Sequence, residues 1–81
     1  MIQEHELKIW PEPYNAVVRG LKTFEVRIND RNYQVNDTLR LREWNPDTKE
    51  YTGRQTLRCV KYIMNGGKFG LPENICVMSI R

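Results

Sequence analysis

Residues 20–27, Gly-Leu-Lys-Thr-Phe-Glu-Val-Arg, say more about the fold than any other part of the sequence. Successive side chains of a β-strand point to opposite faces, so in an extended conformation Phe24 and Val26 share one face. Glu25 and Arg27 then share the other face. The stretch therefore predicts a strand with one apolar face and one polar face, and the polar face is a candidate site.

Working outward from this stretch, the sequence predicts one helix and several more strands. Pro11 and Pro13 suit the first turn of a helix, and Gly20 suits its C-terminal cap. Alternating apolar and polar residues favour the strands. The expected elements are a strand at residues 5–9, a helix at 11–19, and strands at 23–28, 38–44, 55–64 and 75–80. A turn at residues 45–48 predicts that the strands on either side of it form a hairpin.

These elements predict a mainly β (α+β) fold in a single domain, residues 1–81. A short segment at residues 33–35, set between turn-forming residues, brings the number of strands to five or six. Closing so small a sheet into a barrel removes most exposed strand edges. The strand at 75–80 is apolar nearly throughout, as expected if it is buried on both faces or closes a barrel. We therefore expect a small β-barrel plugged by a short helix that follows the first strand.

The composition is that of an ordinary globular domain. Hydrophobic residues make up 40% and charged residues 28% of the 81 residues. No apolar run approaches the roughly 18 residues that span a bilayer. The N-terminus also lacks the basic and apolar regions of a secretory signal, so we expect a cytoplasmic protein with no membrane partner. The net charge of +3 favours polyanionic partners only mildly.

The two cysteines and the single histidine predict no metal site and no cofactor. Cys59 and Cys76 are too far apart in the sequence to form the close pairs of a zinc ribbon or a redox dithiol. We expect both to be buried thiols, because free cysteine packs as a small hydrophobic residue.

The charged residues of the opening stretch favour binding over catalysis. A carboxylate at Glu25 favours the charged form of Lys22, which makes this lysine a cationic anchor instead of a general base. Arg27 can hold a phosphate or carboxylate through two parallel hydrogen bonds. Glu25 can orient Arg27 or accept protons from the exocyclic amine of a base. These three residues are the centre of the expected ligand site.

A longer pattern around this stretch resembles a known family. It consists of residues 5–8 (His-Glu-Leu-Lys), a short helix, the Gly-x-Lys-x-x-Glu-x-Arg motif at 20–27, Asn-Asp-Arg at 29–31, and the segment 37–44 leading to Tyr-Thr-Gly at 51–53. This order is similar to a small bacterial and phage family of unknown function in the ASCH (activating signal cointegrator homology) branch of the PUA-like superfamily. The resemblance covers nearly the whole chain. It implies a PUA-like β-barrel with a cleft beside the helix, and it implies binding of RNA or a modified nucleotide.

The same resemblance gives the alternative function. Some small members of the ASCH branch look like amidohydrolases that remove the acetyl group from acetylated cytidine, and they carry a lysine and a threonine in the motif and a glutamate later in the chain. Lys22 matches the lysine, but Glu25 stands at the place of the threonine, and Thr23 is not its equivalent. Glu43 and Glu73 are the later carboxylates. In this alternative, Lys22 and Glu25 are the catalytic residues of an enzyme that acts on N-acylated nucleosides.

Three more residues complete the expected ligand-binding or nucleic-acid-binding set: Arg31, His5 and Trp44. His5 can act as an acid or base near neutral pH if the first strand places it beside the site. Trp44 and Phe69 can stack on a base, whereas the other aromatic side chains are expected in the core.

Other interpretations of the charged residues stay open. Glu25 and Arg27 can be ion-pair partners that only close the barrel, for example with charged residues of the strand at 38–44. A third function is a protein-interaction module that uses an exposed strand edge or the glycine-rich loop at 66–71.

Two surface features also have alternatives. Arg40, Arg42 and Arg58 form a basic stripe if they share the outer face of the hairpin, or else a solvated face. The loop at 66–71 is either a lid or a connector.

Overall fold

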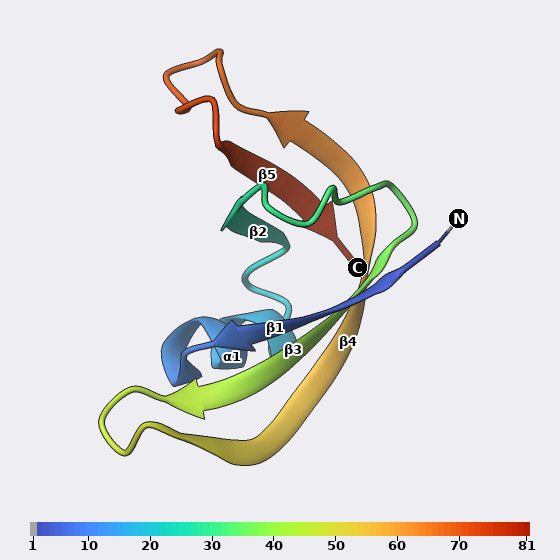
Figure 1. Ribbon diagram of the computed structural model, residues 1–81. Coiled ribbons are helices and arrows are strands. Elements are labelled where there is room, and N and C mark those ends of the chain that lie inside the picture. Colours follow the sequence, from blue (N-terminus) through green and yellow to red (C-terminus); the bar gives the residue numbers. More distant parts are fainter. Residues whose placement is uncertain (1) are drawn as a thin grey trace.

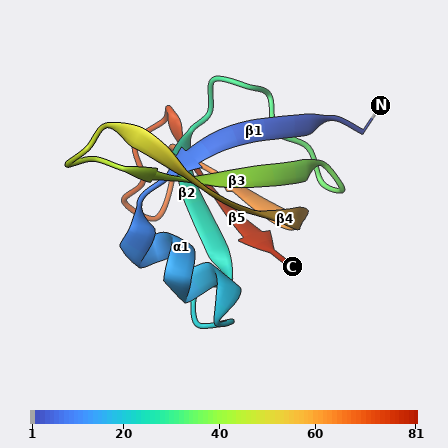
Figure 2. The ribbon, with the colours of Figure 1, turned by 90° about the horizontal axis from the view of Figure 1, so that it is seen from below.

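A strongly curved five-stranded mixed sheet and one helix form the part of the protein that the structure describes, residues 2–81 of a computed structural model (Figures 1 and 2). The elements in chain order are β1 (Glu4–Ile9), α1 (Pro11–Val18), β2 (Phe24–Ile28), β3 (Thr38–Asn45), β4 (Glu50–Asn65) and β5 (Ile75–Ile80). The strand order is β1-β3-β4-β5-β2. β1 and β3 are parallel, and the other neighbouring pairs are antiparallel. The expected hairpin of β3 and β4 is confirmed.

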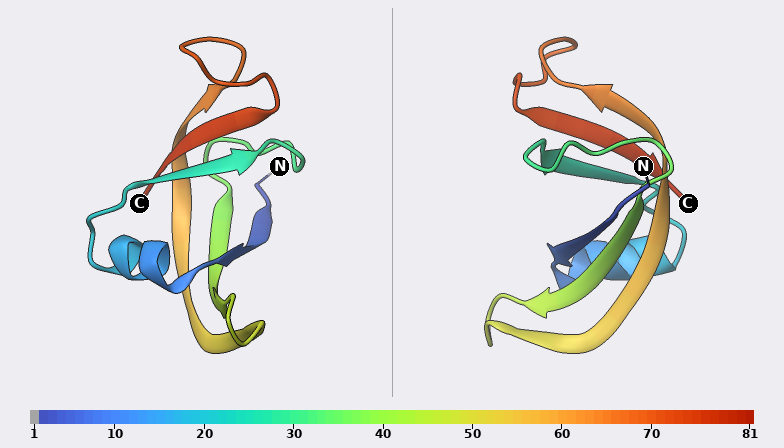
Figure 3. Two further views of the ribbon diagram at one scale, coloured as in Figure 1. Left: turned by 90° about the vertical axis from the view of Figure 1, so that its left-hand side faces the viewer. Right: turned by 45° about the vertical axis from the view of Figure 1, so that its right-hand side comes forward.

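The long strand β4 joins the two halves of the sheet. Its residues 50–59 pair with β3, and its residues 60–65 pair with β5. The strand bends along its length (Figure 3). Because of this bend, β2 at one end of the strand order comes back toward β1 at the other end.

The core lies between the inner face of this curved sheet and α1. Alternate residues of β1 and β3 point inward, as the sequence pattern predicts. The helix adds Tyr14 and Val17. The buried apolar side chains are Leu7, Ile9, Tyr14, Val17, Tyr33, Leu39, Leu41, Val60, Cys76, Met78 and Ile80.

The helix begins and ends where its sequence predicts. Trp10 is extended at the N-terminal cap, and Pro11 follows as the first helical residue, where a missing N–H group costs nothing. Gly20 adopts a positive φ of 75°, and its N–H donates to the carbonyl oxygen of Val17 at 3.0 Å. Such a left-handed glycine is a common end of a helix.

The prediction of a closed barrel is wrong, because the sheet stays open between β1 and β2. Within residues 2–81 no ladder of hydrogen bonds joins these two edge strands. The side chains of Arg27 and Arg31 stand between them and donate to backbone carbonyls of β1. These side chains take the place that a closing ladder would occupy.

The second strand buries its polar face. Glu25 is 3% exposed, whereas Phe24, Val26 and Ile28 on the other face are 45–57% exposed. The alternating pattern therefore predicts the strand correctly, but the apolar face is not the inner one. The inner face of β2 meets the unpaired carbonyl groups of β1, and these groups require hydrogen-bond donors.

Two of the expected strands differ in extent. β4 begins at Glu50, because the turn ends at Lys49, whose φ is positive at 59°. Residues 33–35 form no strand, because Asn32 and Asn36 on either side adopt positive φ angles of 50° and 79°. The chain there is a loop that buries Tyr33.

Two further sequence expectations concern the cysteines and membrane-spanning segments. Cys76 is buried and Cys59 is half-buried, and both are free thiols. Burial raises the pKa of Cys76, so its thiol is protonated at neutral pH. The part of the chain that the structure describes holds no helix long and apolar enough to cross a bilayer.

Candidate functional site

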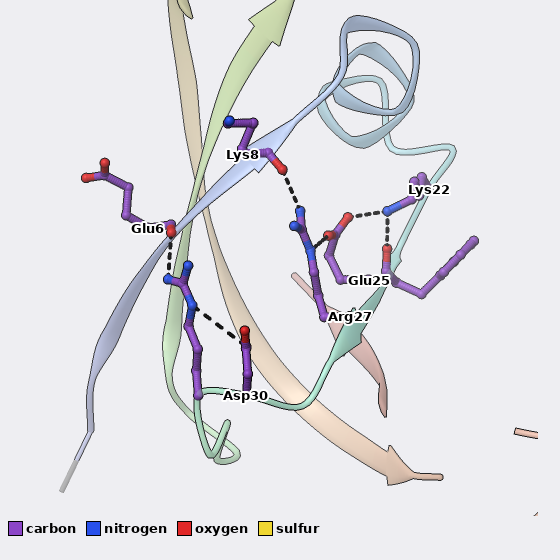
Figure 4. Close-up of polar contacts among 8 residues, drawn as sticks. Glu6, Lys8, Lys22, Glu25, Arg27 and Asp30 are labelled. Atoms are coloured by element: carbon purple, nitrogen blue, oxygen red, sulfur yellow. Dashed lines mark hydrogen bonds and ion pairs between the residues drawn. The ribbon is translucent and has the colours of Figure 1, made fainter. Parts of the chain in front are cut away.

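The carboxylate of Glu25 is the centre of the candidate site. Lys22 Nζ donates to Glu25 Oε1, and Arg27 Nε donates to Glu25 Oε2 at 2.8 Å (Figure 4). Lys22 Nζ also donates to the carbonyl oxygen of Phe24 at 2.6 Å. Each oxygen of the buried carboxylate thus accepts from its own cationic donor, and these hydrogen bonds offset the free energy lost on burying the charge.

The end of the helix and the second strand hold these residues in place. The N–H groups of Leu21 and Lys22 both donate to the carbonyl oxygen of Ala16, at 2.9 and 3.0 Å. The strand ladder with β5 fixes Glu25 and Arg27. The predicted cluster of Lys22, Glu25 and Arg27 is therefore brought together by two elements that are adjacent in the chain.

Two arginine side chains, one of them from this cluster, reach the edge of β1. Arg27 Nη2 donates to the carbonyl oxygen of Lys8 at 3.0 Å, and Arg31 Nη1 donates to that of Glu6 at 2.8 Å (Figure 4). Glu6 and Lys8 are two residues apart, so their carbonyl groups point to the same side of β1. The arginines satisfy acceptors that an edge strand otherwise leaves to water.

A pocket of about 250 Å³ lies between the start of α1 and this cluster. Its lining residues are Lys8, Ile9, Trp10, Pro13, Lys22, Glu25, Val26 and Arg27. Trp10 is 57% exposed, so its ring offers a free apolar face beside charged groups. Lys22 and Arg27 place two positive charges against the one carboxylate of Glu25, so the pocket is electropositive. It therefore suits a flat, polar ligand with some negative charge.

Trp10 is a site residue that sequence reasoning missed. The alternating pattern of the first strand extends to Ile9, and Trp10 comes immediately before Pro11. A tryptophan at the junction of a strand and a helix is held outside both apolar faces. That position is the signal that could have marked Trp10 as exposed.

The structure places His5 away from the pocket. His5 Nε2 lies 2.8 Å from Asp37 Oδ2, and both side chains are buried. Asp37 also accepts hydrogen bonds from the N–H groups of Gln3 and Gln34, at 3.0 and 2.9 Å. Burial alone raises the pKa of Asp37, but hydrogen bonds from two backbone N–H groups and from His5 outweigh burial and hold it below 3.8. This cluster fastens the start of β1 to the loop before β3.

The two aromatic residues singled out for stacking also lie elsewhere. Trp44 does not line the pocket, and Lys8 Nζ lies 4.1 Å from its ring centroid. Phe69 is 80% exposed in the loop between β4 and β5. That loop lies at the end of the molecule away from α1, where it connects two strands (Figure 1).

The later glutamates are not part of the pocket. Glu43 is buried and accepts two hydrogen bonds from Arg54, at 2.9 and 2.8 Å, and one from Thr52 at 2.6 Å. The hydrogen bond from Arg54 is the main cause that lowers the pKa of Glu43. Arg54 also donates to Asn15 of α1 at 2.9 Å, so this cluster fastens the helix to the hairpin. Glu73 is exposed in the loop before β5.

Arg40, Arg42 and Arg58 do not form a basic stripe. Arg40 and Arg42 pair with Glu4 and Glu6, each at 2.8 Å. Arg58 lies opposite Leu39, whose side chain is on the inner face. Of the two alternatives, the structure favours the solvated face, because the outer arginines are neutralised across β1 and β3 and the third arginine is on the other face.

The side chains that line the pocket are charged, aromatic or apolar. Among the residues that the structure describes, those lining it include no serine, threonine, cysteine or histidine. Thr23 lies instead beside Ser79 and Arg81, at a separate surface hollow.

Comparison with known proteins identifies a family of unknown function. A sequence profile with the description "Domain of unknown function (DUF3850)" matches residues 4–80. A protein of Escherichia phage P2 named "Uncharacterized 12.9 kDa protein in GpA 3'region" is 40% identical over 55 residues, which are 68% of this chain and 49% of the phage protein. The chain thus spans about half the length of that relative. Because the profile covers every element from β1 to β5, the chain belongs to the family of this domain of unknown function.

Proposed function

We propose that this domain binds RNA or a modified nucleotide, with one base in the pocket between Trp10 and Glu25. The observation that carries the proposal is the buried carboxylate of Glu25, held by Lys22 and Arg27 at the side of an electropositive pocket with an exposed tryptophan. Stacking on an aromatic ring contributes about 1 to 3 kcal/mol per base. The same pocket therefore combines a stacking surface with a polar edge.

The polar edge can read one side of a base. A carboxylate oxygen has a second lone pair after it accepts one hydrogen bond, so Glu25 can still accept from an exocyclic amine. Lys22 Nζ has three N–H groups, two of which donate to Phe24 and Glu25. The third can donate to a ring nitrogen or a carbonyl oxygen of the base. This pairing favours bases with an amine beside an acceptor, such as cytosine and adenine.

The fold and the motif support a relationship to the ASCH branch of the PUA-like superfamily. A short helix follows the first strand, and the Gly-x-Lys-x-x-Glu-x-Arg motif lies beside that helix. This placement agrees with the cleft beside the helix that the resemblance implies. In this proposal the domain is ASCH-like, and the Gly-x-Lys-x-x-Glu-x-Arg motif contacts the bound nucleotide.

The amidohydrolase alternative has less support from the geometry. Lys22 Nζ donates to the buried carboxylate of Glu25 and to the carbonyl oxygen of Phe24, so this amine is engaged as a hydrogen-bond donor. The pocket lining within residues 2–81 supplies no hydroxyl or thiol nucleophile. Glu25 is itself occupied by two cations. Binding therefore accounts for these residues better than hydrolysis does.

The test is a titration at low salt of cytidine, acetylated cytidine and short single-stranded RNA, followed by calorimetry. We expect wild-type protein to bind at least one of these, and Lys22→Gln to weaken binding about tenfold, because a hydrogen bond to a charged group is lost. Lys61→Gln is the matched control, because Lys61 is exposed and does not line the pocket. Equal affinity of both variants, or binding by none of the proteins, would contradict the proposal. Chromatography of the acetylated cytidine after incubation separates binding from hydrolysis.

A further inference from the structure

A second pocket lies on the other side of Arg27. It has a volume of about 300 Å³ and is lined by Leu7, Val26, Arg27, Ile28, Asp30, Arg31 and Tyr33. Val26 and Arg27 line both pockets, so the two pockets are adjacent and Arg27 lies between them.

Two guanidinium groups are fixed at this second pocket. They are anchored to carbonyl oxygens of Lys8 and Glu6, which a strand separates by about 7 Å. Within the described residues, Arg27 Nη1 and Arg31 Nη2 have no hydrogen-bond partner. Both arginines line this pocket, and each therefore keeps a free donor beside it.

Tyr33 supplies a third donor. Its side chain is only 5% exposed, and its ring packs edge-on against His5 with centroids 4.8 Å apart. No described residue hydrogen bonds to its hydroxyl, yet no fully buried side-chain oxygen is left without a partner. The hydroxyl oxygen is therefore accessible, and it reaches the surface at the pocket that Tyr33 lines. Burial raises the pKa of Tyr33, so the hydroxyl keeps its proton.

We propose that this second pocket is the phosphate subsite of the nucleotide, with Arg27, Arg31 and Tyr33 as its donors. The inference rests on the proposed function, and it adds that the ligand crosses Arg27 with its base on one side and its phosphate on the other. Guanidinium groups match the geometry of phosphate oxygens, and planar forks anchored by backbone lose little entropy on binding. A nucleotide is then recognised at two points, and a nucleoside at one.

One acidic group opposes this assignment and makes it testable. The carboxylate of Asp30 lies 4.0 Å from Arg31 Nε and is 65% exposed, at the rim of the pocket. Like charges repel, so Asp30 lowers the affinity for phosphate. Asp30→Asn is therefore expected to strengthen phosphate binding several-fold at low salt, which a merely destabilised protein would not do.

The same phosphate chemistry has two sources: the terminal monoester of a free nucleotide and the internal diester of RNA. Calorimetric titrations with cytidine, cytidine 5′-monophosphate, cytidine 3′-monophosphate and the dinucleotide CpC distinguish them. We expect at least one phosphorylated probe to bind about tenfold more tightly than cytidine, because charge-assisted hydrogen bonds are added. A gain confined to the monophosphates assigns the monoester, and a gain shared by CpC assigns the diester.

Substitutions test which residues provide the gain in affinity from the phosphate group. Arg31→Gln should abolish it, Tyr33→Phe should reduce it, and Arg19→Gln should keep it, because Arg19 carries the same charge but lines neither pocket. Inorganic phosphate should also shift the Arg31 Nε resonance in the wild-type spectrum. Tight binding of cytidine with no gain from any phosphate would overturn the subsite and leave the proposed function intact. A phosphate-dependent shift of Arg31 without binding of any nucleoside or nucleotide would instead overturn the nucleotide function.

Discussion

Arg27 Nη2 donates to the carbonyl oxygen of Lys8 at 3.0 Å, and this hydrogen bond connects β2 with β1, the two edge strands of the open sheet. The same guanidinium donates from Nε to the buried Glu25. A single side chain thus stabilises the open sheet and orients the carboxylate of the proposed site.

Replacing this arginine tests its structural part. Arg27→Met keeps most of the apolar stem but leaves Glu25 with one cation and Lys8 without its donor. We expect the free energy of unfolding to fall by about 2 kcal/mol, because a buried charged group loses a hydrogen bond. Urea unfolding measures the change. Arg19→Met at the exposed end of α1 is the control, and an equal effect of both substitutions would show that Arg27 has no special structural role.

Glu25→Gln tests how the base is read. The amide has a similar shape, but it donates as well as accepts, so it no longer selects for an exocyclic amine. We expect wild-type protein to prefer cytidine over uridine about tenfold, and the variant to lose this preference. The measurement is the ratio of the two dissociation constants. An unchanged ratio would mean that Glu25 does not contact the base.

The buried aspartate predicts a dependence of stability on pH. The pKa of Asp37 is held below its ordinary value of 3.8, so the unfolded state binds its proton first as the pH falls. The contribution of Asp37 to stability is therefore complete above about pH 5, and it is lost as the pH falls through the depressed folded value. Asp37→Asn should lower stability at neutral pH by about 1 to 3 kcal/mol, because the N–H groups of Gln3 and Gln34 lose a charged acceptor.

The same variant should flatten the acid side of the profile. Thermal unfolding between pH 2 and pH 7 gives the comparison, and Asp47→Asn in the exposed hairpin turn is the control. Parallel profiles for wild-type protein and Asp37→Asn would contradict a depressed pKa at Asp37. The pKa of Glu43 is also lowered, so Glu43 adds its own loss of stability as the pH falls. The profile of Asp37→Asn should therefore be flatter than that of wild-type protein, but not completely flat.

Glu43→Gln separates helix anchoring from ligand binding. The substitution weakens the two hydrogen bonds from Arg54, which also holds Asn15 of the helix. We expect a lower melting temperature and an unchanged affinity for nucleotides, because Glu43 does not line either pocket. A normal melting temperature with a loss of binding or turnover would contradict this expectation and assign Glu43 to the site.

Local sequence signals predicted most of the elements but not how the sheet ends meet. The alternation of Leu39 and Leu41 with Arg40 and Arg42 predicts β3, and Pro11 and Gly20 predict the limits of α1 to within a residue. Closure between β1 and β2 depends on contacts between residues about 20 positions apart, such as Arg27 with Lys8. Periodicity contains no information on such contacts.

The site shows the same division. Lys22, Glu25 and Arg27 are close in the sequence, and their cluster was predictable from the motif. The sequence did not predict which face of β2 is buried, because the apolar residues of this strand are the exposed ones. The role of Trp10 also depends on the turn from strand to helix, which composition does not reveal.

The most direct test of the proposed function uses the two tryptophans of the chain. Trp10 lines the pocket and Trp44 does not, so the single-tryptophan variants Trp44→Phe and Trp10→Phe report on different places. Each is titrated with the probe that binds most tightly in calorimetry, while tryptophan fluorescence is recorded. We expect saturable quenching in Trp44→Phe, which retains Trp10, and no quenching in Trp10→Phe. Saturable quenching that follows Trp44, or binding without any change in Trp10 fluorescence, would contradict a base stacked in this pocket.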